Sequence, residues 1–329
     1  MRIFKDLAAW QNKPGQSLVL AIGNFDGLHA GHQKILSRVI SGARDSKALP
    51  AVFTFREHPQ QILHPSSRPK LLTGLEHRLF RLQQTGLGIC FLLEFTREFS
   101  EQEPEAFVRD ILVERLHVKK ICLGYNARFG RKRRGDSSLM KALAEKHGFE
   151  FEEIPPVKIA DGFVSSTRVR ELVSGGDLKQ AAECLGRPFS ILAKVVRGDG
   201  RGKTIGYPTA NLETADEVLP PAGVYTAKVR IVEIEKKAAG GSEDLKVSVE
   251  HPWLNAVLNR GTRPTFKSAS GREVQEAFIL DFQGDLYGKT LEVAFYEKIR
   301  EEKAFPSTDE LKKQIEKDVL EAGKRFLDH

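Results

Sequence analysis

The chain has 329 residues, 40% of them hydrophobic, which is enough for two domains with real cores at roughly 150 residues per domain. This composition excludes wholesale disorder. The 51 Lys and Arg outnumber the 44 Asp and Glu and leave a formal net charge of +7, which favours an anionic partner. Nucleic acid, a membrane surface and a nucleotide all remain open at this point.

Three cysteines, Cys90, Cys122 and Cys184, lie far apart in apolar runs and form no CxxC pair. We therefore expect neither a disulfide framework nor a zinc site, and we predict a reducing, cytoplasmic setting. No stretch approaches the ~20 apolar residues that span a bilayer, and the N-terminus has no uninterrupted apolar run. The expectation is a soluble, unprocessed protein that makes no membrane contact.

In the first half, short apolar strands alternate with segments of helical spacing. The expected strands are 18–22, 51–55, 89–93, 119–123 and 149–154, and the expected helices are 33–43, 75–84, 104–116 and 137–147. Strands that are apolar on both faces and alternate with helices indicate a parallel sheet covered by helices. We predict a doubly wound α/β domain over residues 1–186.

After residue 186 the pattern changes to β-branched runs separated by turn residues. The expected strands are 191–196, 224–234, 246–249, 255–258, 274–282 and 290–295. An amphipathic helix is expected over 307–326, with a Ser-Thr-Asp cluster able to cap it. Residues 187–329 are thus predicted to form an antiparallel β-barrel or sandwich with a terminal helix.

The first motif, GNFDGLHAGH, occupies residues 23–32 directly after the first long strand and runs into a helix. The carboxyl end of a parallel strand faces the ligand crevice, and the next helix presents free N–H groups to an anion. His29 and His32 lie on one side of the first turn, where they can donate hydrogen bonds to a phosphate. The alternative is that a histidine at a helix start only caps the helix. A phosphate-binding site is favoured because a Gly lies between the two histidines and because the segment lacks the GKS/T sequence of a P-loop.

A second motif, SSTRVR, occupies residues 165–170 at another predicted helix start. The hydroxyls of Ser165, Ser166 and Thr167 have one simple alternative role, the N-cap of that helix. Arg168 and Arg170 within the same turn favour phosphate binding.

Together these motifs resemble the His-x-Gly-His and Ser-Ser-Thr-x-x-Arg motifs of the nucleotidyltransferase superfamily. The version here is similar to the adenylyltransferase half of the bacterial bifunctional riboflavin kinase/FAD synthetase family. Residues 53–59 and 124–130 add to the likeness, with departures at Glu57 and over 125–127.

The resemblance implies that FMN and ATP react to give FAD and pyrophosphate. The FMN phosphate is already anionic at pH 7, so catalysis reduces to positioning and charge neutralisation. It implies that His29 and His32 stabilise the transition state and that Mg²⁺ shields the triphosphate. The residues expected to bind the nucleotides are Gly23, Asn24, Phe25, Asp26, Asn126, Arg128, Ser165, Ser166, Thr167 and Arg170.

The second half carries a Gly-rich basic loop, residues 196–212, which includes Arg201 and Lys203. Such a loop in a β protein is by default a long hairpin, whereas glycines and cations together suit phosphates. The loop ends in Pro-Thr-Ala-Asn, in which Thr209 and Asn211 can point the same way and share one hard cation.

This stretch resembles the riboflavin kinase domain, as do 219–225, 261–266 and 276–288. The resemblance implies that Glu276 is the general base for the riboflavin hydroxyl and that Thr209 and Asn211 hold Mg²⁺; without it, Glu276 is one of many strand glutamates. Departures are Arg260 and a polar excursion over 235–250, expected to be a hairpin loop far from the chemistry. Further residues expected to bind substrate are Gly198, Arg201, Gly202, Lys203, Gly206, Arg263 and Thr265.

Two alternatives remain. Residues 115–135 hold eight Lys or Arg and no Asp or Glu, a run that could grip a nucleic-acid backbone, although no RNP-like aromatic motif accompanies it. A single-activity enzyme with one decayed domain is the other. We predict small-molecule substrates, riboflavin, FMN and ATP, and no nucleic acid, because without that run the chain is close to neutral. The oligomeric state is left open.

Overall fold

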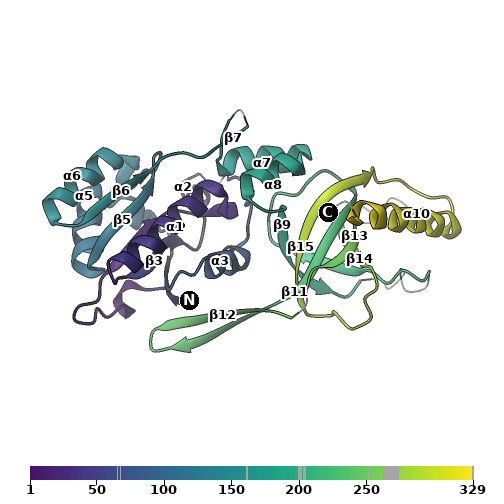
Figure 1. Cartoon of the computed structure of the whole chain (residues 1–329), viewed down its shortest axis with the longest axis horizontal. Coiled ribbons are helices and arrows are strands. Elements are labelled where there is room, and N and C mark those ends of the chain that lie inside the picture. The colour runs from purple at the N-terminus through teal and green to yellow at the C-terminus, as the bar shows by residue number, and fades with distance from the viewer. Residues whose placement is uncertain are drawn as a thin grey trace. The chain divides into compact units, whose positions relative to one another are not determined.

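The computed structural model describes residues 1–64, 66, 68–160, 162–198, 202, 205–250, 252–261 and 274–327, and Figure 1 labels its elements. Its contacts divide the chain into two compact units. The first comprises Met1–Leu71, Leu75–Ser166 and Ile234–Val247, and the second comprises Leu72–Gly74, Thr167–Glu233 and Ser248–His329. This division differs from the predicted ranges 1–186 and 187–329, which stay a prediction of where the two activities divide.

The sheet of the first unit has the strand order β12-β1-β4-β3-β2-β5-β6. Its strands are β1 (Arg2–Phe4), β2 (Leu18–Ile22), β3 (Leu49–Phe55), β4 (Ile89–Leu93), β5 (Val118–Gly124), β6 (Glu150–Ile154) and β12 (Ser242–Val249). All neighbours from β1 to β6 pair in parallel. The connection order reverses at β2, which lies between β3 and β5, and the carboxyl ends of strands at such a point flank the ligand crevice.

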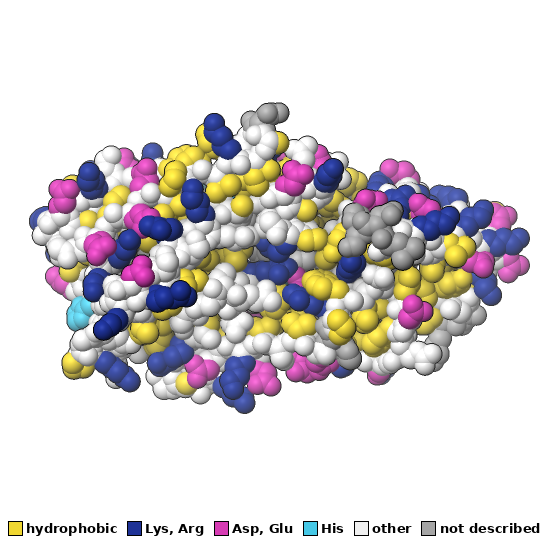
Figure 2. All heavy atoms as spheres, viewed as in Figure 1, with side chains coloured by type: hydrophobic (Ala, Val, Ile, Leu, Met, Phe, Trp, Pro, Cys, Tyr) yellow, Lys and Arg dark blue, Asp and Glu magenta, His cyan; other side chains and the backbone are white. Residues whose placement is uncertain are grey.

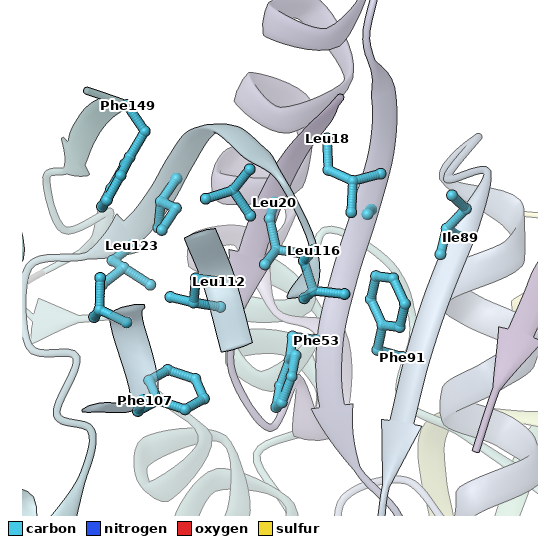
Figure 3. Packing of buried hydrophobic residues seen from close by; sticks show 14 of the residues in the cluster. Leu18, Leu20, Phe53, Ile89, Phe91, Phe107, Leu112, Leu116, Leu123 and Phe149 are labelled. Carbon is cyan, nitrogen blue, oxygen red and sulfur yellow. The ribbon is translucent and has the colours of Figure 1, made fainter. Parts of the chain in front are cut away.

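Both faces of this sheet are covered, because alternate residues of each strand enter different cores. Leu18, Leu20 and Phe53 pack with helix α6 (Ser137–His147) and the Phe107–Arg115 segment, as Figure 3 shows in part. Val19 and Val52 enter a second cluster with helices α1 (Ala30–Asp45) and α3 (Leu75–Gln84). The two-sided burial explains why these strands read as continuous apolar runs in the sequence.

The helices of the first unit mostly start and end near their predicted positions. They are α1 (Ala30–Asp45), α2 (Pro59–Leu63), α3 (Leu75–Gln84), α4 (Arg97–Ser100), α5 (Pro104–Ala106) and α6 (Ser137–His147), with short 3₁₀ turns at Leu7–Ala9, Asp26–Leu28 and Arg131–Arg133. The predicted helix 104–116 is α5 followed by a π-helical segment, Phe107–Arg115. A small hairpin of β7 (Lys158–Ile159) and β8 (Gly162–Phe163) was not expected from the sequence.

The second unit is a closed antiparallel β-barrel. Its strands are β9 (Ser190–Val196), β10 (Ala210–Thr214), β11 (Gly223–Ala239), β13 (Leu254–Gly261), β14 (Val274–Ile279) and β15 (Thr290–Arg300). They close in the order β9-β10-β14-β13-β11-β15-β9. The predicted terminal helix is α10 (Thr308–Leu327), which buries Ala322 against Val224 and Val257. Helices α7 (Ser166–Gly175) and α8 (Leu178–Leu185) precede the barrel.

Residues 235–250 belong to a hairpin, as expected, but most of them are paired strand and not loop. They form the outer part of a long hairpin, in which β11 continues to Ala239 and β12 begins at Ser242. Strand β12 pairs with β1, a strand too short for the sequence pattern to reveal. An apolar stripe on an otherwise polar hairpin allows this pairing, as described below.

Conversely, a short segment from the first half of the sequence, Leu72–Gly74, belongs to the second unit. The Gly74 N–H donates to the buried carboxylate of Glu217, at 2.5 Å from Oε1. A charge-assisted bond of this kind holds the segment, because Glu217 is 3% exposed. Each unit therefore contains a segment from the other half of the sequence.

Candidate functional site

The loop between β2 and α1 has an unusual backbone. The Gly23 N–H donates to the Phe53 carbonyl, and after it Phe25, Gly27 and Leu28 all have positive φ, of 54°, 77° and 43°. Left-handed backbone in Phe and Leu is costly and persists where the surrounding structure enforces it, which is typical of functional loops. Phe25 and Leu28 are buried, so their packing holds the loop in this form.

The two histidines of the motif lie together at the start of α1. His29 is the N-cap residue, and its Nδ1 accepts a hydrogen bond from the His32 backbone N–H at 3.3 Å. The imidazole rings stack with centroids 3.7 Å apart. A Cβ on Gly31 would lie 3.1 Å from Cε1 of His29, so the glycine makes room for the folded-back ring. Because Nδ1 of His29 is an acceptor, the neutral ring carries its proton on Nε2.

His32 is held neutral. Burial first, and then the neighbouring His29, lower the pKa of His32 well below its usual 6.5. Its Nδ1 is buried and has no hydrogen-bond partner among the residues that the structure describes. A neutral imidazole with an unused nitrogen suits hydrogen bonding to a ligand rather than charge neutralisation.

Asn24 is fixed by Arg78, a residue that the sequence analysis missed. The Arg78 guanidinium donates to the carbonyl and to Oδ1 of Asn24, at 3.1 and 3.2 Å. It also donates to the carbonyls of Phe55 and Arg56 at the end of β3. The Asn24 amide nitrogen is buried and, within the described part of the chain, has no partner. It can therefore donate to a substrate.

Arg78 had a signal in the sequence. It occupies an apolar-stripe position of α3, three residues after Leu75 and four before Leu82, and it is 3% exposed. A guanidinium on such a stripe must find acceptors in the interior. Burial lowers the pKa of Arg78, and the nearby Asp26 carboxylate partly opposes that shift.

The Ser-Ser-Thr segment meets the same loop. The Ser166 hydroxyl donates to the Asp26 carbonyl at 3.0 Å, across 140 positions of sequence, and Asp26 is 1% exposed. Ser165 also belongs to the first unit, whereas Thr167 and Arg170 continue α7 and belong to the second. The structure thus brings Ser166 to the histidine loop.

Asn126 and Arg128 follow β5, the strand next to β2, and both are exposed. The Arg128 guanidinium donates to its neighbour's carbonyl, that of Ala127. Beside them lies an exposed aromatic pair that the sequence analysis missed, Tyr125 and Phe163, with ring centroids 6.2 Å apart. Exposed aromatic faces at a strand end suit a flat ring system.

The basic run 115–135 is not one patch. Arg115 donates to the Leu7 carbonyl, Lys120 pairs with Glu152 at 2.8 Å, and Arg131 pairs with Glu101 at 2.7 Å. On the face seen in Figure 2, Lys and Arg side chains are interspersed with Asp and Glu. Most of these cations are thus occupied by contacts within the chain.

The barrel site is built on neighbouring strands. Asn211 of β10 lies directly opposite Glu276 of β14, and Asn259 of β13 lies on the other side of Glu276. Directly opposite residues share a face of the sheet. A Cβ on Gly198 would lie 2.1 Å from Nδ2 of Asn211, so Gly198 leaves the space that the amide occupies.

The approach to this pair is a tight turn. Gly202 accepts hydrogen bonds from Ile205 and Tyr207 N–H, and a Cβ there would lie 3.1 Å from Oγ1 of Thr209. Gly206 has φ of 87°, which favours glycine. Arg201, Lys203, Arg263 and Thr265 lie outside the described residues.

The oxygen atoms of Thr209 and Asn211 fit a hard cation, because Mg²⁺ prefers hydroxyl, amide and phosphate oxygens. Gly198 and Gly202 leave the space that these two side chains occupy. Among the described residues, no group of three or more His, Cys, Asp and Glu side chains is arranged to hold a metal. The donor set therefore suits a cation that also keeps substrate or water oxygens.

The chain has a paired-histidine loop at a parallel strand end and an Asn–Glu pair in a barrel, two candidate sites that fit a transferase with two activities. The family model for FAD synthetase matches residues 11–168, and that for riboflavin kinase matches 185–326. The chain is 35% identical to the bifunctional riboflavin kinase/FMN adenylyltransferase of Haemophilus influenzae, over 96% of both chains. It belongs to the family of bifunctional riboflavin kinase/FMN adenylyltransferases.

Two further comparisons cover nearly the whole chain. The bifunctional riboflavin kinase/FMN adenylyltransferase of Escherichia coli K12 is 34% identical over 99% of this chain and 98% of its own. A crystal structure from Streptococcus pneumoniae, named a macrolide-efflux protein, aligns with a TM-score of 0.78 and 29% identity over 96% of both chains. In the described part of this chain, no helix is long and apolar enough to cross a membrane.

Proposed function

We infer that this chain makes FAD in two steps at two sites: ATP phosphorylates riboflavin to FMN at the barrel site, and FMN then takes AMP from ATP at the histidine loop. Family membership over nearly the full length supports both reactions. The observation that supports the second site most directly is the stacked, loop-held pair of His29 and His32. We assign the first unit a nucleotidyltransferase-like fold.

Adenylyl transfer at the first site needs positioning more than proton transfer. An FMN phosphate oxygen attacks the α-phosphorus of ATP and pyrophosphate leaves, so no side chain has to remove a proton. His29, through Nε2–H, and neutral His32 donate hydrogen bonds to oxygens that gain charge in the transition state. The Asn24 amide adds a further donor, since its nitrogen is buried and unused among the described contacts.

Two residues, the predicted Ser166 and the unpredicted Arg78, have supporting roles at this site. Ser166 holds the loop through the Asp26 carbonyl, and Arg78 holds Asn24 against the end of β3. Both act on the geometry of the loop, and Arg78 is therefore a positioning residue. Gly23, Phe25, Asn126, Arg128, Ser165, Thr167 and Arg170 remain proposed nucleotide contacts.

Phosphoryl transfer at the barrel site needs a base, because the riboflavin acceptor is a neutral primary hydroxyl. Glu276 is the proposed base. It is half-buried and lies opposite Asn211. Thr209 and Asn211 would hold Mg²⁺, which lowers the charge on ATP phosphates when bound. Gly198, Arg201, Gly202, Lys203, Gly206, Arg263 and Thr265 remain proposed contacts for ATP or flavin.

A cytoplasmic setting remains our proposal, and the three free, buried cysteines favour it. The occupied cations of the basic run disfavour a nucleic-acid partner. The test of the function is an assay with riboflavin, ATP and Mg²⁺, in which FMN and FAD are separated by chromatography. Successive appearance of FMN and FAD is expected, and the absence of either flavin would contradict the two-step assignment.

A further inference from the structure

The outer part of the β11–β12 hairpin belongs to the unit that holds the histidine loop. The sequence matched to riboflavin kinase is 185–326, yet its segment Ile234–Val247 is part of the first compact unit. Strand β12 pairs with β1 through Arg2 and Asp244 and through Ile3 and Glu243. The Leu245 N–H donates to the Met1 carbonyl at 2.9 Å.

Without this pairing, β1 would be a three-residue edge strand. It is held on its other side by β4, in a parallel register that sets Ile3 opposite Cys90. Short parallel edge strands are weak, and unpaired edges expose their N–H and C=O groups. The hairpin thus completes the sheet of the first unit.

The contact is also apolar. Leu245 is 1% exposed and lies in the cluster of Ile3 and Val52, and Ile234 and Val247 pack against the same cluster. At the hairpin tip, Gly240 and Gly241 have φ of 55° and 86°, as a two-residue turn requires. A Cβ on Gly241 would lie 2.9 Å from Cβ of Ala9, so the tip packs closely against the first unit.

Two ion pairs flank this apolar contact. Lys236 pairs with Glu76 of α3, and Lys5 pairs with Glu243, each at 2.5 Å. Exposed pairs contribute little energy, but opposite charges on both sides of a strand disfavour a register slip, which would turn Leu245 outward. The charges therefore select one docking register.

The hairpin also forms one wall of a cavity of about 450 Å³ in the first unit. Lys236 and Glu243 line it together with Arg56, Leu79 and Leu93. The Arg56 carbonyl accepts a hydrogen bond from Arg78, which holds Asn24 of the histidine loop. The ion pair of Lys236 with Glu76 on α3, the helix that carries Arg78, also connects the hairpin to that loop.

We propose that the β11–β12 hairpin is a working part of the adenylyltransferase unit, so that FAD formation requires a segment that lies within the kinase half of the sequence. The partner of the β1 edge is this chain's own hairpin, recognised by Leu245 and the flanking charges. The proposal rests on the assignment of FMN adenylylation to the first unit. It predicts that the two activities, although they use separate residues, do not divide at residues 186 and 187.

The test compares Leu245→Asp with Lys246→Asp in the full chain. The two residues are neighbours on β12, one buried and one exposed, so the control places the same aspartate side chain on the same strand. Riboflavin phosphorylation and FMN adenylylation are measured on each preparation, and hydrogen exchange is followed over residues 1–10, 89–93 and 254–261.

In Leu245→Asp, FAD formation should fall by about tenfold or more, and exchange over residues 1–10 and 89–93 should rise by a similar factor, because an edge strand loses its partner. FMN formation and exchange over 254–261 should stay within about twofold of wild type, and Lys246→Asp should change neither activity. Wild-type exchange in β1, or wild-type FAD formation, would overturn the proposal. Hydrogen exchange depends on neither activity. If the proposed function is wrong, exchange over β1 still rises in Leu245→Asp although wild type itself forms no FAD.

A second variant keeps the test decisive if Leu245→Asp causes the whole chain to misfold. Residues 236–245 are replaced by Asn-Gly, which keeps a two-residue turn but removes the strand that pairs with β1. Retained FMN formation shows that the barrel is folded. Loss of FAD formation in that same preparation supports the proposal, and wild-type FAD formation refutes it.

Discussion

The two sites are held together in different ways. The histidine loop depends on contacts between distant parts of the sequence: Ser166 reaches Asp26 across 140 positions, and Arg78 reaches Asn24 across 54. The barrel site depends on register, because Asn211 and Glu276 are opposed on paired strands. The first site should therefore respond to substitutions far from its motif, and the second to small steric changes between neighbouring strands.

The largest expected effect is at the barrel site. Glu276→Gln should lower FMN formation by about 10²–10⁴-fold, because an amide cannot accept the hydroxyl proton. FAD formation from supplied FMN should stay at the wild-type rate. Steady-state rates of both steps check this, with Glu213→Gln, an exposed glutamate of β10, as the matched control. An unchanged phosphorylation rate would remove Glu276 from the role of base.

A single methyl group tests the steric sensitivity of the barrel site. Gly198→Ala places a Cβ in the space of the Asn211 amide and should lower FMN formation by roughly 10²-fold, since a displacement of about 1 Å at a reacting centre has such a cost. Gly175→Ala, where nothing lies within 4 Å of the new Cβ, is the control. If both variants phosphorylate riboflavin equally well, the position of the Asn211 side chain does not matter for phosphoryl transfer, which contradicts its proposed role.

The remote contacts of the histidine loop are tested by Arg78→Lys. Lysine keeps the positive charge but lacks the guanidinium group whose several N–H donors join Asn24 to the end of β3. FAD formation should therefore fall by about tenfold, mainly in kcat. Arg81→Lys on the next turn of α3 should have little effect. A purely structural role would lower the unfolding temperature and the amount of active enzyme but leave the KM and kcat of the folded fraction unchanged.

The smallest expected effect is on the pH dependence of stability, which tests the buried environment of the histidine loop. His32 has a lowered pKa in the folded chain, so below its unfolded pKa of about 6.5 the unfolded chain binds more protons. Its contribution to stability is complete above that pH and is lost as the pH falls toward the folded pKa. Thermal unfolding between about pH 8 and pH 5 should show a steeper decline in wild type than in His32→Gln; parallel curves would contradict a neutral His32.

Local patterns predicted much of this molecule. Apolar runs located β2, β3 and β4, because both faces of these strands are buried. The motif around His29 and His32 identified one loop, and alternation predicted a shared side for Thr209 and Asn211, of which Asn211 lies in β10 and Thr209 directly precedes it. Each of these signals lies within about ten residues of sequence, where periodicity and turn chemistry act.

The features that the sequence did not predict depend on contacts between residues that are far apart in the sequence. Strand β1 has three residues, too few for a periodic signal, and its pairing with β12 requires the hairpin to reach it. Residues 235–250 were interpreted as an extended hairpin loop because they are mostly polar, and the strand pairing made through buried Leu245 was missed. Arg78 was overlooked because most of its acceptors are backbone carbonyls, which no sequence pattern displays.

The central claim is that two separate sites carry the two reactions, and His32→Ala tests it most directly. The variant is supplied with riboflavin, ATP and Mg²⁺, and both flavins are followed by chromatography, with Lys34→Ala on the same helix as control. The account predicts that FMN accumulates at the wild-type rate while FAD formation falls by about 10²–10³-fold. FAD formation near the wild-type rate, or loss of FMN formation with intact folding, would contradict it.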